Sequence, residues 1–248
     1  MEIRLKLRDL KLFGIESNYE IRNKEAIEEK LSHLEFLELL LEDEITDRET
    51  RKLRLRRARA NLPSIKKIEE FDFDFQPTIN RSLIYDLASC NFVWSFENVI
   101  LMWQPWTWKT HLAIWLAYKA ILSWYKVLFT VMTNMISTLN KWRAEGTYES
   151  KMKQYISPDL LVIDELGFKK IDQEIANDLF DIISKRHETK SMIITSNKSF
   201  DEWQDIFSDK VIAGAIIDRL VYHGHVLSIK WESYRAQHSK SRKNKDKS

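Results

Sequence analysis

Three segments of this chain carry polar side chains where apolar runs end, which is where a parallel sheet presents catalytic groups. The first is Lys109-Thr110, which follows the apolar run 98–102 and a short loop and opens the helical pattern 109–121. Strand, loop, Lys-Thr and helix form the context of a phosphate-binding loop. The context predicts an ATP site made of Trp103, Gln104, Pro105, Trp106, Thr107, Trp108, Lys109, Thr110 and His111.

The second segment ends in two carboxylates. Residues 160–165 form an apolar run that finishes with Asp164 and Glu165. At the carboxyl end of a parallel strand, Asp164 would reach a Mg²⁺ ion beside the phosphates, and Glu165 would orient and deprotonate an attacking water. Taken alone, the segment fits equally a strand that ends in a polar turn.

The third segment, residues 193–197, is an apolar run that ends in Asn197. Its amide could hydrogen-bond the γ-phosphate or the attacking water, although an asparagine in this position also suits a turn or a helix cap. The three segments in this order favour an ATPase. Two later arginines are weaker candidates, Arg219 as a finger across a subunit boundary and Arg235 as a nucleotide contact, because each alone resembles any surface arginine.

The elements that must position these residues alternate along the chain. Apolar runs at 98–102, 126–131, 160–164, 191–196 and 225–229 predict strands, and the helical patterns between and after them span 109–121, about 134–145, 172–187, 200–206 and 210–222. Buried strands that alternate with helices are typical of an α/β fold with a parallel sheet covered on both faces.

A helical region precedes this core. Leu31, Leu34, Leu37, Leu41 and Ile45 recur at helical spacing and predict an amphipathic helix. A basic stretch follows, in which we predict that Arg51, Arg54, Arg56, Arg57 and Arg59 contact DNA phosphates. The plainer interpretation is a solvated helix face. We expect a helical DNA- or partner-binding region at 1–75, an ATP-binding domain at 76–237 and a disordered basic tail at 238–248.

Composition narrows the class of protein. The net charge of 248 residues is only +2, so any affinity for nucleic acid must come from local basic patches. The one cysteine, Cys90, excludes a disulfide framework, and no apolar run reaches the roughly 18–20 residues of a membrane span. A cytoplasmic location is expected. Glycine is scarce, with 5 residues against 9 tryptophans.

Together the motifs resemble the IstB/DnaC-type AAA+ ATPases, P-loop NTPases whose parallel sheet is flanked by helices. The resemblance covers nearly the whole chain, and it is closest to the IstB helpers of insertion-sequence transposition. It implies that Lys109 contacts the β- and γ-phosphates, that Thr110 and Asp164 hold Mg²⁺, that Glu165 is the catalytic carboxylate, that Asn197 is the sensor and that Arg219 is the finger. Arg235 is a looser match.

The same resemblance implies the partners. Such helpers bind double-stranded DNA, self-associate into an oligomer on it and deliver the target to a transposase. DnaC-type relatives load a replicative helicase instead, which remains the first alternative for this chain. The second alternative is a DNA-binding adaptor that does not hydrolyse ATP, and it follows from the tryptophans of the loop.

The family has glycine at Trp103, Trp106, Trp108, Trp231 and, by the same comparison, Trp124. Indoles in the loop would fill the space of the phosphates and disfavour positive φ angles. One hypothesis is a decayed ATPase. A second hypothesis is that UGA codons, which some organisms read as glycine, have been translated as tryptophan. The substitutions favour the second hypothesis because nearly all are of one kind, while every charged and polar partner of the loop is retained. ATPase activity is predicted only if these positions are glycine.

Overall fold

A computed structural model describes residues 2–71, 80–102 and 109–228. The chain divides into two compact units, Met1–Ala58 and Arg59–Ser248. The first unit contains α1 (Glu2–Asp9), α2 (Phe13–Glu29) and most of α3 (His33–Arg59). Helices α2 and α3 meet where Gly14 lies against α3, since a Cβ on Gly14 would fall 2.5 Å from the carbonyl oxygen of Asp43. The buried carboxylate of Glu44 accepts the Gly14 amide at 2.8 Å.

The predicted amphipathic helix is present as α3, but the face that it buries differs from the prediction. Leu34, Leu37, Leu41 and Ile45 are all exposed, with Leu34 at 79%. The buried positions of α3 are Leu40 and Glu44, one helical turn apart. The side of α3 that carries Leu40 and Glu44 therefore faces α2, whereas the regularly spaced leucines lie on the exposed side of the helix.

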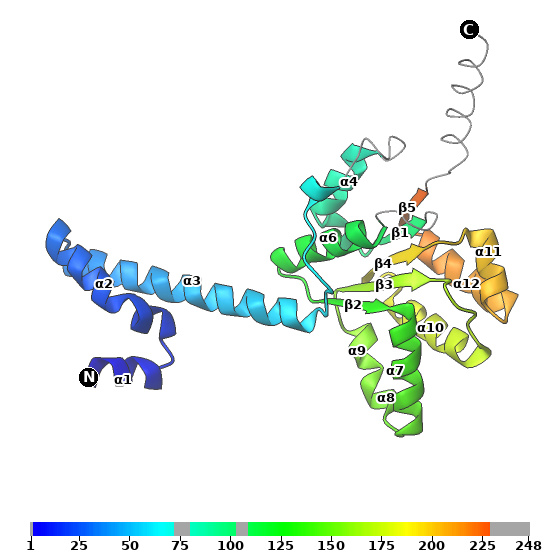
Figure 1. The fold of residues 1–248 in the computed structure, drawn as a ribbon, viewed down its shortest axis with the longest axis horizontal. Helices are drawn as coiled ribbons and strands as arrows, with labels where there is room; N and C mark the ends of the chain where they lie inside the picture. The colour runs from blue at the N-terminus through cyan, green and yellow to red at the C-terminus, as the bar shows by residue number, and fades with distance from the viewer. Residues whose placement is uncertain (1, 72–79, 103–108, 229–248) are drawn as a thin grey trace, which may run out of the picture. The chain divides into compact units, whose positions relative to one another are not determined.

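The second unit is built on a five-stranded parallel sheet with strand order β2-β3-β4-β1-β5 (Figure 1). The strands are β1 (Asn98–Met102), β2 (Val127–Val131), β3 (Leu160–Leu166), β4 (Ser191–Ser196) and β5 (Gly224–Ser228). The helices are α4 (Arg81–Ala88), α5 (Asn91–Trp94), α6 (Lys109–Leu122), α7 (Met132–Ala144), α8 (Tyr148–Lys151), α9 (Lys153–Ile156), α10 (Gln173–Arg186), α11 (Phe200–Ile206) and α12 (Lys210–Val221), with a 3₁₀ turn at Ile68–Glu70. The predicted α/β fold with helices on both faces of a parallel sheet is confirmed.

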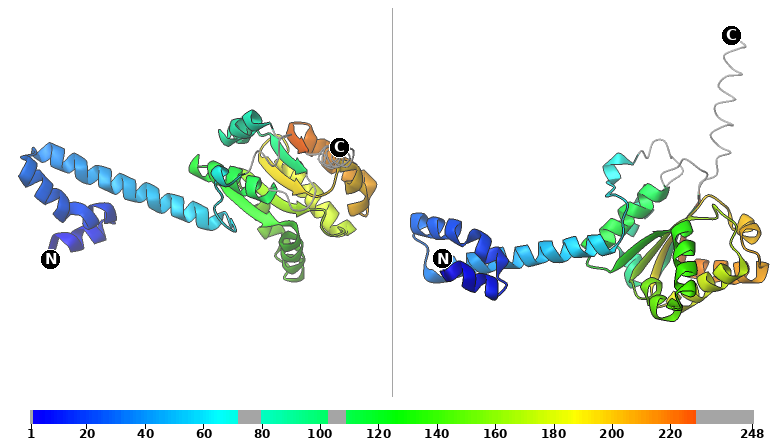
Figure 2. Two further views of the ribbon diagram at one scale, coloured as in Figure 1. Left: turned by 45° about the horizontal axis from the view of Figure 1, so that its top comes forward. Right: turned by 60° about the horizontal axis from the view of Figure 1, so that its bottom comes forward.

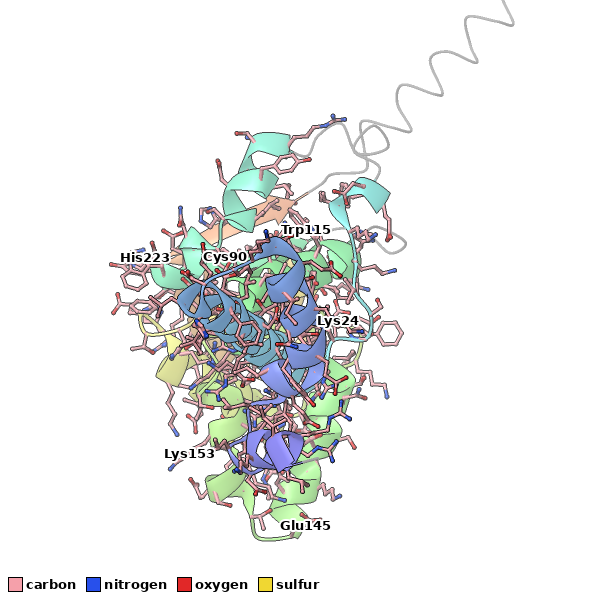
Figure 3. The ribbon with its side chains drawn as sticks, turned by 90° about the vertical axis from the view of Figure 1, so that its left-hand side faces the viewer. Lys24, Cys90, Trp115, Glu145, Lys153 and His223 are labelled. Carbon is pink, nitrogen blue, oxygen red and sulfur yellow. The ribbon has the colours of Figure 1, made fainter. Side chains whose placement is uncertain are left out.

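Alternate side chains of each strand pack on opposite faces of this sheet. One face, with Ile100, Leu161 and Ile194, joins a cluster of buried residues contributed by α7, α9, α10, α11 and α12. Helix α6 covers the other face and contacts four of the strands (Figures 1 and 2). Trp115 of α6 and Cys90, between α4 and α5, are buried and are labelled in Figure 3.

The amino ends of β3 and β4 are fixed by one buried cation. Arg186, the last residue of α10, is fully buried and donates to the carbonyl oxygens of Tyr155, Pro158 and Ser191 at 2.6–3.0 Å. Segment 146–157, which looks only polar in the sequence, contains α8 and α9 and brings Tyr155 into the core. These hydrogen bonds fix the amino ends of the two strands and thereby also set where their carboxyl ends lie.

Residues 59–71 pack with the sheet of the second unit. Ala60 is fully buried, and its carbonyl oxygen accepts the amide of Phe129 on β2 at 2.8 Å. The Phe71 ring lies edge-on to His111, with ring centroids 6.1 Å apart. The second unit therefore begins at Arg59, earlier than the predicted division between 75 and 76. Residues 72–79, around that predicted division, lie outside the described part of the chain.

Candidate nucleotide-binding site

Two of the predicted metal ligands touch at the carboxyl edge of the sheet. The hydroxyl of Thr110 lies 2.9 Å from Oδ1 and 3.0 Å from Oδ2 of Asp164. Thr110 is in the first turn of α6, and Asp164 is a buried residue near the end of β3. The fold thus brings the Lys-Thr segment and the carboxylate segment together, as their order in the sequence predicted.

Lys109 opens α6 and is buried, with 8% of its surface exposed. Burial lowers the pKa of its ammonium group, while the negative charges of Asp164 and Glu165 act in the opposite direction. The amino end of a helix also carries positive partial charge and main-chain N–H groups without partners in the helix. A buried cation beside that end is a site that favours an anion such as phosphate.

Glu165 owes its exposure to a bulge in β3. Ile163 pairs with Ile194 and Leu166 with Ser196, so β3 has one residue more than β4 in this interval. Glu165 takes a left-handed conformation with φ +63° and is exposed between the buried Asp164 and Leu166. A bulge of this kind re-aims a side chain. Here it leaves the Glu165 carboxylate in solvent at the edge that carries Asp164.

Thr195 completes the site, and the sequence did not single it out. This fully buried residue of β4 donates its hydroxyl to Asp164 Oδ1 at 2.5 Å and accepts the main-chain N–H of Glu165 at 2.9 Å. Its position inside an apolar run, two residues before Asn197, was the available signal. A hydroxyl in a strand core needs a partner, and the partner here is the acidic pair of the neighbouring strand.

Asn197 follows β4 directly, on the same edge of the sheet. Its side-chain Oδ1 is buried and has no hydrogen-bond partner among the described residues. A buried carbonyl oxygen without a partner is costly unless a ligand or water satisfies it. The atom is therefore suited to the predicted role of accepting a hydrogen bond from an attacking water, which remains a prediction.

Two predicted site residues, His111 and Arg219, have side-chain partners away from Asp164. Nε2 of the His111 ring lies 2.8 Å from the carbonyl oxygen of Lys67. The Arg219 side chain donates to Ala215 on its own helix and lies 4.7 Å from the centre of the Phe180 ring. Arg235 lies outside the described residues, as do the predicted nucleotide contacts 103–108.

Arg219 is also at the wrong edge of the sheet to serve the site of its own chain. The next residue, Leu220, accepts a hydrogen bond from Asn98, with which β1 begins. Asp164 lies near the other end of its strand. Arg219 could serve as a finger only toward the site of another subunit, which is how its role was predicted.

Trp124 has a backbone conformation that is typical of glycine. Its φ is +68°, and it terminates α6 with its own amide donating to Ile121 and the Tyr125 amide donating to Ala120, at 3.1 and 3.0 Å. This pattern of bonds ends many helices, usually with glycine in the left-handed position. Trp203, in contrast, is fully buried and its indole donates to Ser196 at 3.0 Å. The geometry at 124 fits the glycine that the resemblance implies there.

The basic stretch of α3 is only partly available to DNA. Arg51 lies 2.5 Å from Asp47 and packs over the Phe13 ring at 4.7 Å, so its charge is engaged within the first unit. Arg54, Arg57 and Arg59 are exposed, and Arg56 is half-buried. The predicted DNA contact therefore falls mainly to the three exposed arginines.

Among the described residues, Lys109, Thr110 and Asp164 fit a Mg²⁺ ion and phosphate groups. One buried carboxylate and one hydroxyl in contact make a partial oxygen site, which suits a Mg²⁺ ion that takes its other ligands from phosphate and water. Among the described residues there is no cluster of three or more His, Cys, Asp or Glu side chains that would hold a metal by itself. None of the described helices is long and apolar enough to cross a membrane.

Comparison with known proteins gives a family match. The sequence profile described as IstB-like ATP binding protein matches residues 5–242. An ATP-binding protein named for insertion sequence IS21 of Pseudomonas aeruginosa is 39% identical over 234 residues, which cover 94% of this chain and 88% of that protein. A protein named likewise for IS5376 of Geobacillus stearothermophilus is 37% identical and covers 88% and 86%.

Solved structures share the fold. The DnaC helicase loader superposes with a TM-score of 0.53 at 21% identity, over 69% of this chain and 97% of that one. DnaI superposes with a TM-score of 0.55 at 18% identity, over 70% and 94%. AMPPCP-bound DnaA from Aquifex aeolicus gives 0.57 at 19% identity, over 68% and 51%. At these identities the likeness concerns the fold alone.

Proposed function

The chain belongs to the family of IstB-like ATP-binding proteins, and from that premise we propose that it is the ATP-hydrolysing helper of a DNA transposition reaction. Its sheet order and structural neighbours are those of a AAA+ P-loop domain. The observation that carries the proposal is the contact of Thr110 with Asp164 beside the buried Lys109. These are the residue types that bind phosphate and magnesium, gathered at the amino end of a helix.

In the proposed reaction each residue has one task. Lys109 binds the terminal phosphates, while Thr110 and Asp164 hold Mg²⁺, which would neutralise charge on the phosphate oxygens. Glu165 accepts a proton as the water oxygen bonds to the γ-phosphorus and the bond to the β–γ bridging oxygen breaks. Asn197 Oδ1 accepts the second proton of that water in a hydrogen bond and so orients it.

We further propose that the helper binds double-stranded DNA, through Arg54, Arg57 and Arg59, and self-associates on it. In such an oligomer Arg219 of one subunit would face the nucleotide of the next. A transposase is the proposed recipient of the DNA, since both relatives described above are named for insertion sequences. Loading a helicase is less supported, because the DnaC and DnaI likeness is limited to the fold.

The tryptophans of the loop decide whether the chain hydrolyses ATP. We define a glycine form, in which the five positions where the resemblance implies glycine are changed together: Trp103→Gly, Trp106→Gly, Trp108→Gly, Trp124→Gly and Trp231→Gly. The proposal expects the glycine form to release phosphate from ATP in the presence of Mg²⁺. It expects Glu165→Gln in that form to bind ATP but to hydrolyse it at least about a hundredfold more slowly.

The experiment also separates the alternative of a non-hydrolysing adaptor. If the glycine form binds DNA but neither binds nor hydrolyses ATP, the ATPase proposal is wrong and the adaptor is favoured. A glycine form that hydrolyses ATP equally well with Glu165→Gln would contradict the assignment of the catalytic carboxylate while leaving the ATPase itself in place.

A further inference from the structure

We propose that Thr195 is a positioning residue for the ATPase reaction, which sets both the Asp164 carboxylate and the backbone that presents Glu165. This inference rests on the proposed function and adds a residue to it. Thr195 lies on β4, the strand beside β3, and its side chain is fully buried. One hydroxyl group thus contacts both members of the acidic pair.

The direction of each hydrogen bond follows from the chemistry of a hydroxyl group. The Glu165 main-chain N–H can only donate, so Thr195 Oγ1 accepts it at 2.9 Å. The hydroxyl proton is then available for Asp164 Oδ1 at 2.5 Å. Bonds from a hydroxyl to a carboxylate are stronger than neutral ones. The two bonds together tie the side chain of one acidic residue to the main chain of the next.

Glu165 needs such a restraint because its conformation is unfavourable. A residue other than glycine with φ near +60° costs about 1–3 kcal/mol and persists only where its surroundings enforce it. Thr195 satisfies the amide of Glu165 in that conformation, and it does so at the one position where β4 is a residue shorter than β3. Without the hydroxyl, the main-chain N–H of Glu165 would lose this hydrogen bond.

Ser196 holds the other end of the bulge. Its hydroxyl donates to the carbonyl oxygen of Leu166 at 2.7 Å and accepts the indole N–H of Trp203 at 3.0 Å. Thr195 and Ser196 of β4 therefore both bind the bulged segment through hydroxyl groups. Of the two, only Thr195 bonds to the Asp164 carboxylate and to the main chain of Glu165, so the positioning role is assigned to Thr195.

A threonine that only fills a buried position on its strand would not link the two acidic residues. This difference can be tested. Thr195→Val keeps the shape of the side chain and removes the hydroxyl, whereas Thr195→Ser keeps the hydroxyl. Ser191→Ala is the matched control, because it removes a buried hydroxyl bond from the other end of β4, where Ser191 donates to Phe92 at 2.9 Å. Thermal unfolding of each full-length variant verifies that it folds.

The first readout is amide hydrogen exchange of the nucleotide-free full chain. Thr195→Val is expected to speed exchange of the Glu165 amide by about tenfold, as loss of one hydrogen bond would, and Thr195→Ser and Ser191→Ala are expected to leave it unchanged. Unchanged exchange in a folded Thr195→Val protein overturns the proposal, and so does an equal increase in Ser191→Ala.

The second readout is hydrolysis by the glycine form. Thr195→Val is expected to lower kcat for ATP by about ten- to a hundredfold with little change in KM, and Thr195→Ser is expected to restore it. A kcat equal to that of the parent would contradict the positioning role. If the parent glycine form itself is inactive, the proposed function fails, while the exchange measurement still decides whether Thr195 holds Glu165.

Discussion

Thr110 Oγ1 lies 2.9 Å from Oδ1 of Asp164, although 54 positions of sequence separate the two residues. The contact joins the first turn of α6 to the end of β3, and it places a hydroxyl and a carboxylate where a Mg²⁺ ion could take both as ligands. Binding of Mg²⁺-ATP by this chain should therefore depend on both side chains.

Asp164→Asn should remove the dependence of nucleotide binding on Mg²⁺. An amide keeps the shape of the carboxylate but loses the charge that holds the ion. In the glycine form, titration with a fluorescent ATP analogue should show tighter binding with Mg²⁺ than with EDTA for the parent, and equal binding for Asp164→Asn. A variant that keeps the full Mg²⁺ effect would remove Asp164 from the metal site.

Trp124→Gly alone should stabilise the second unit. Glycine adopts φ +68° without the steric cost that a side chain imposes, so the free energy of unfolding should rise by about 1 kcal/mol. Urea unfolding measures the change. The control is Trp142→Gly, which should destabilise by about 3–5 kcal/mol because Trp142 is buried and its ring lies 5.4 Å from that of Tyr155. A Trp124→Gly protein less stable than its parent would contradict the assignment of a glycine position.

The codons of the gene should distinguish the positions assigned to glycine from a genuine tryptophan. We expect UGA codons for Trp103, Trp106, Trp108, Trp124 and Trp231, and a UGG codon for Trp203, whose buried indole donates to Ser196. Mass spectrometry of the protein from its own cells should then find glycine in the peptide that contains position 124. UGG codons at the loop positions would rule out the glycine hypothesis and leave a decayed ATPase.

Changing Arg54 and Arg57 together to glutamine should weaken binding to double-stranded DNA. The slope of log K against log salt concentration should become shallower by about 2, or about 0.9 for each lost phosphate contact. A charge-matched control is Arg4→Gln with Lys24→Gln, two exposed cations elsewhere in the first unit. Equal slopes for the two double variants would show that the basic stretch is only a solvated helix face.

The sheet could be predicted well from the sequence because its central strands β1, β3 and β4 are buried on both faces. Near-continuous apolar runs such as 191–196 indicate buried parallel strands in a chain where helices alternate with them. The buried face of α3 was not predictable in the same way, because periodicity identifies a stripe but does not say whether anything covers it. Leu34 belongs to the regular stripe and is exposed, whereas Glu44 is charged and buried.

The part of the site that could be predicted from the sequence consists of the polar residues at the ends of strands. Asp164, Glu165 and Asn197 are in such positions, and the parallel sheet brings the ends of their strands to one edge. The bulge at Glu165 and the role of Thr195 were not predictable, since both depend on a register shift between β3 and β4. A register shift of one residue between two strands does not change the apolar pattern of either strand's sequence.

Isothermal titration of the chain with Mg²⁺-ATP tests the central claim most directly, that this edge of the sheet is a nucleotide site whose loop requires glycine. The glycine form should bind one ATP per subunit, and it should lose that binding with Lys109→Ala. The chain with tryptophan at all five positions should bind at least about a hundredfold more weakly, since indoles take the space of the phosphates. Equal binding by the two forms would refute the steric argument, and no binding by the glycine form would refute the site.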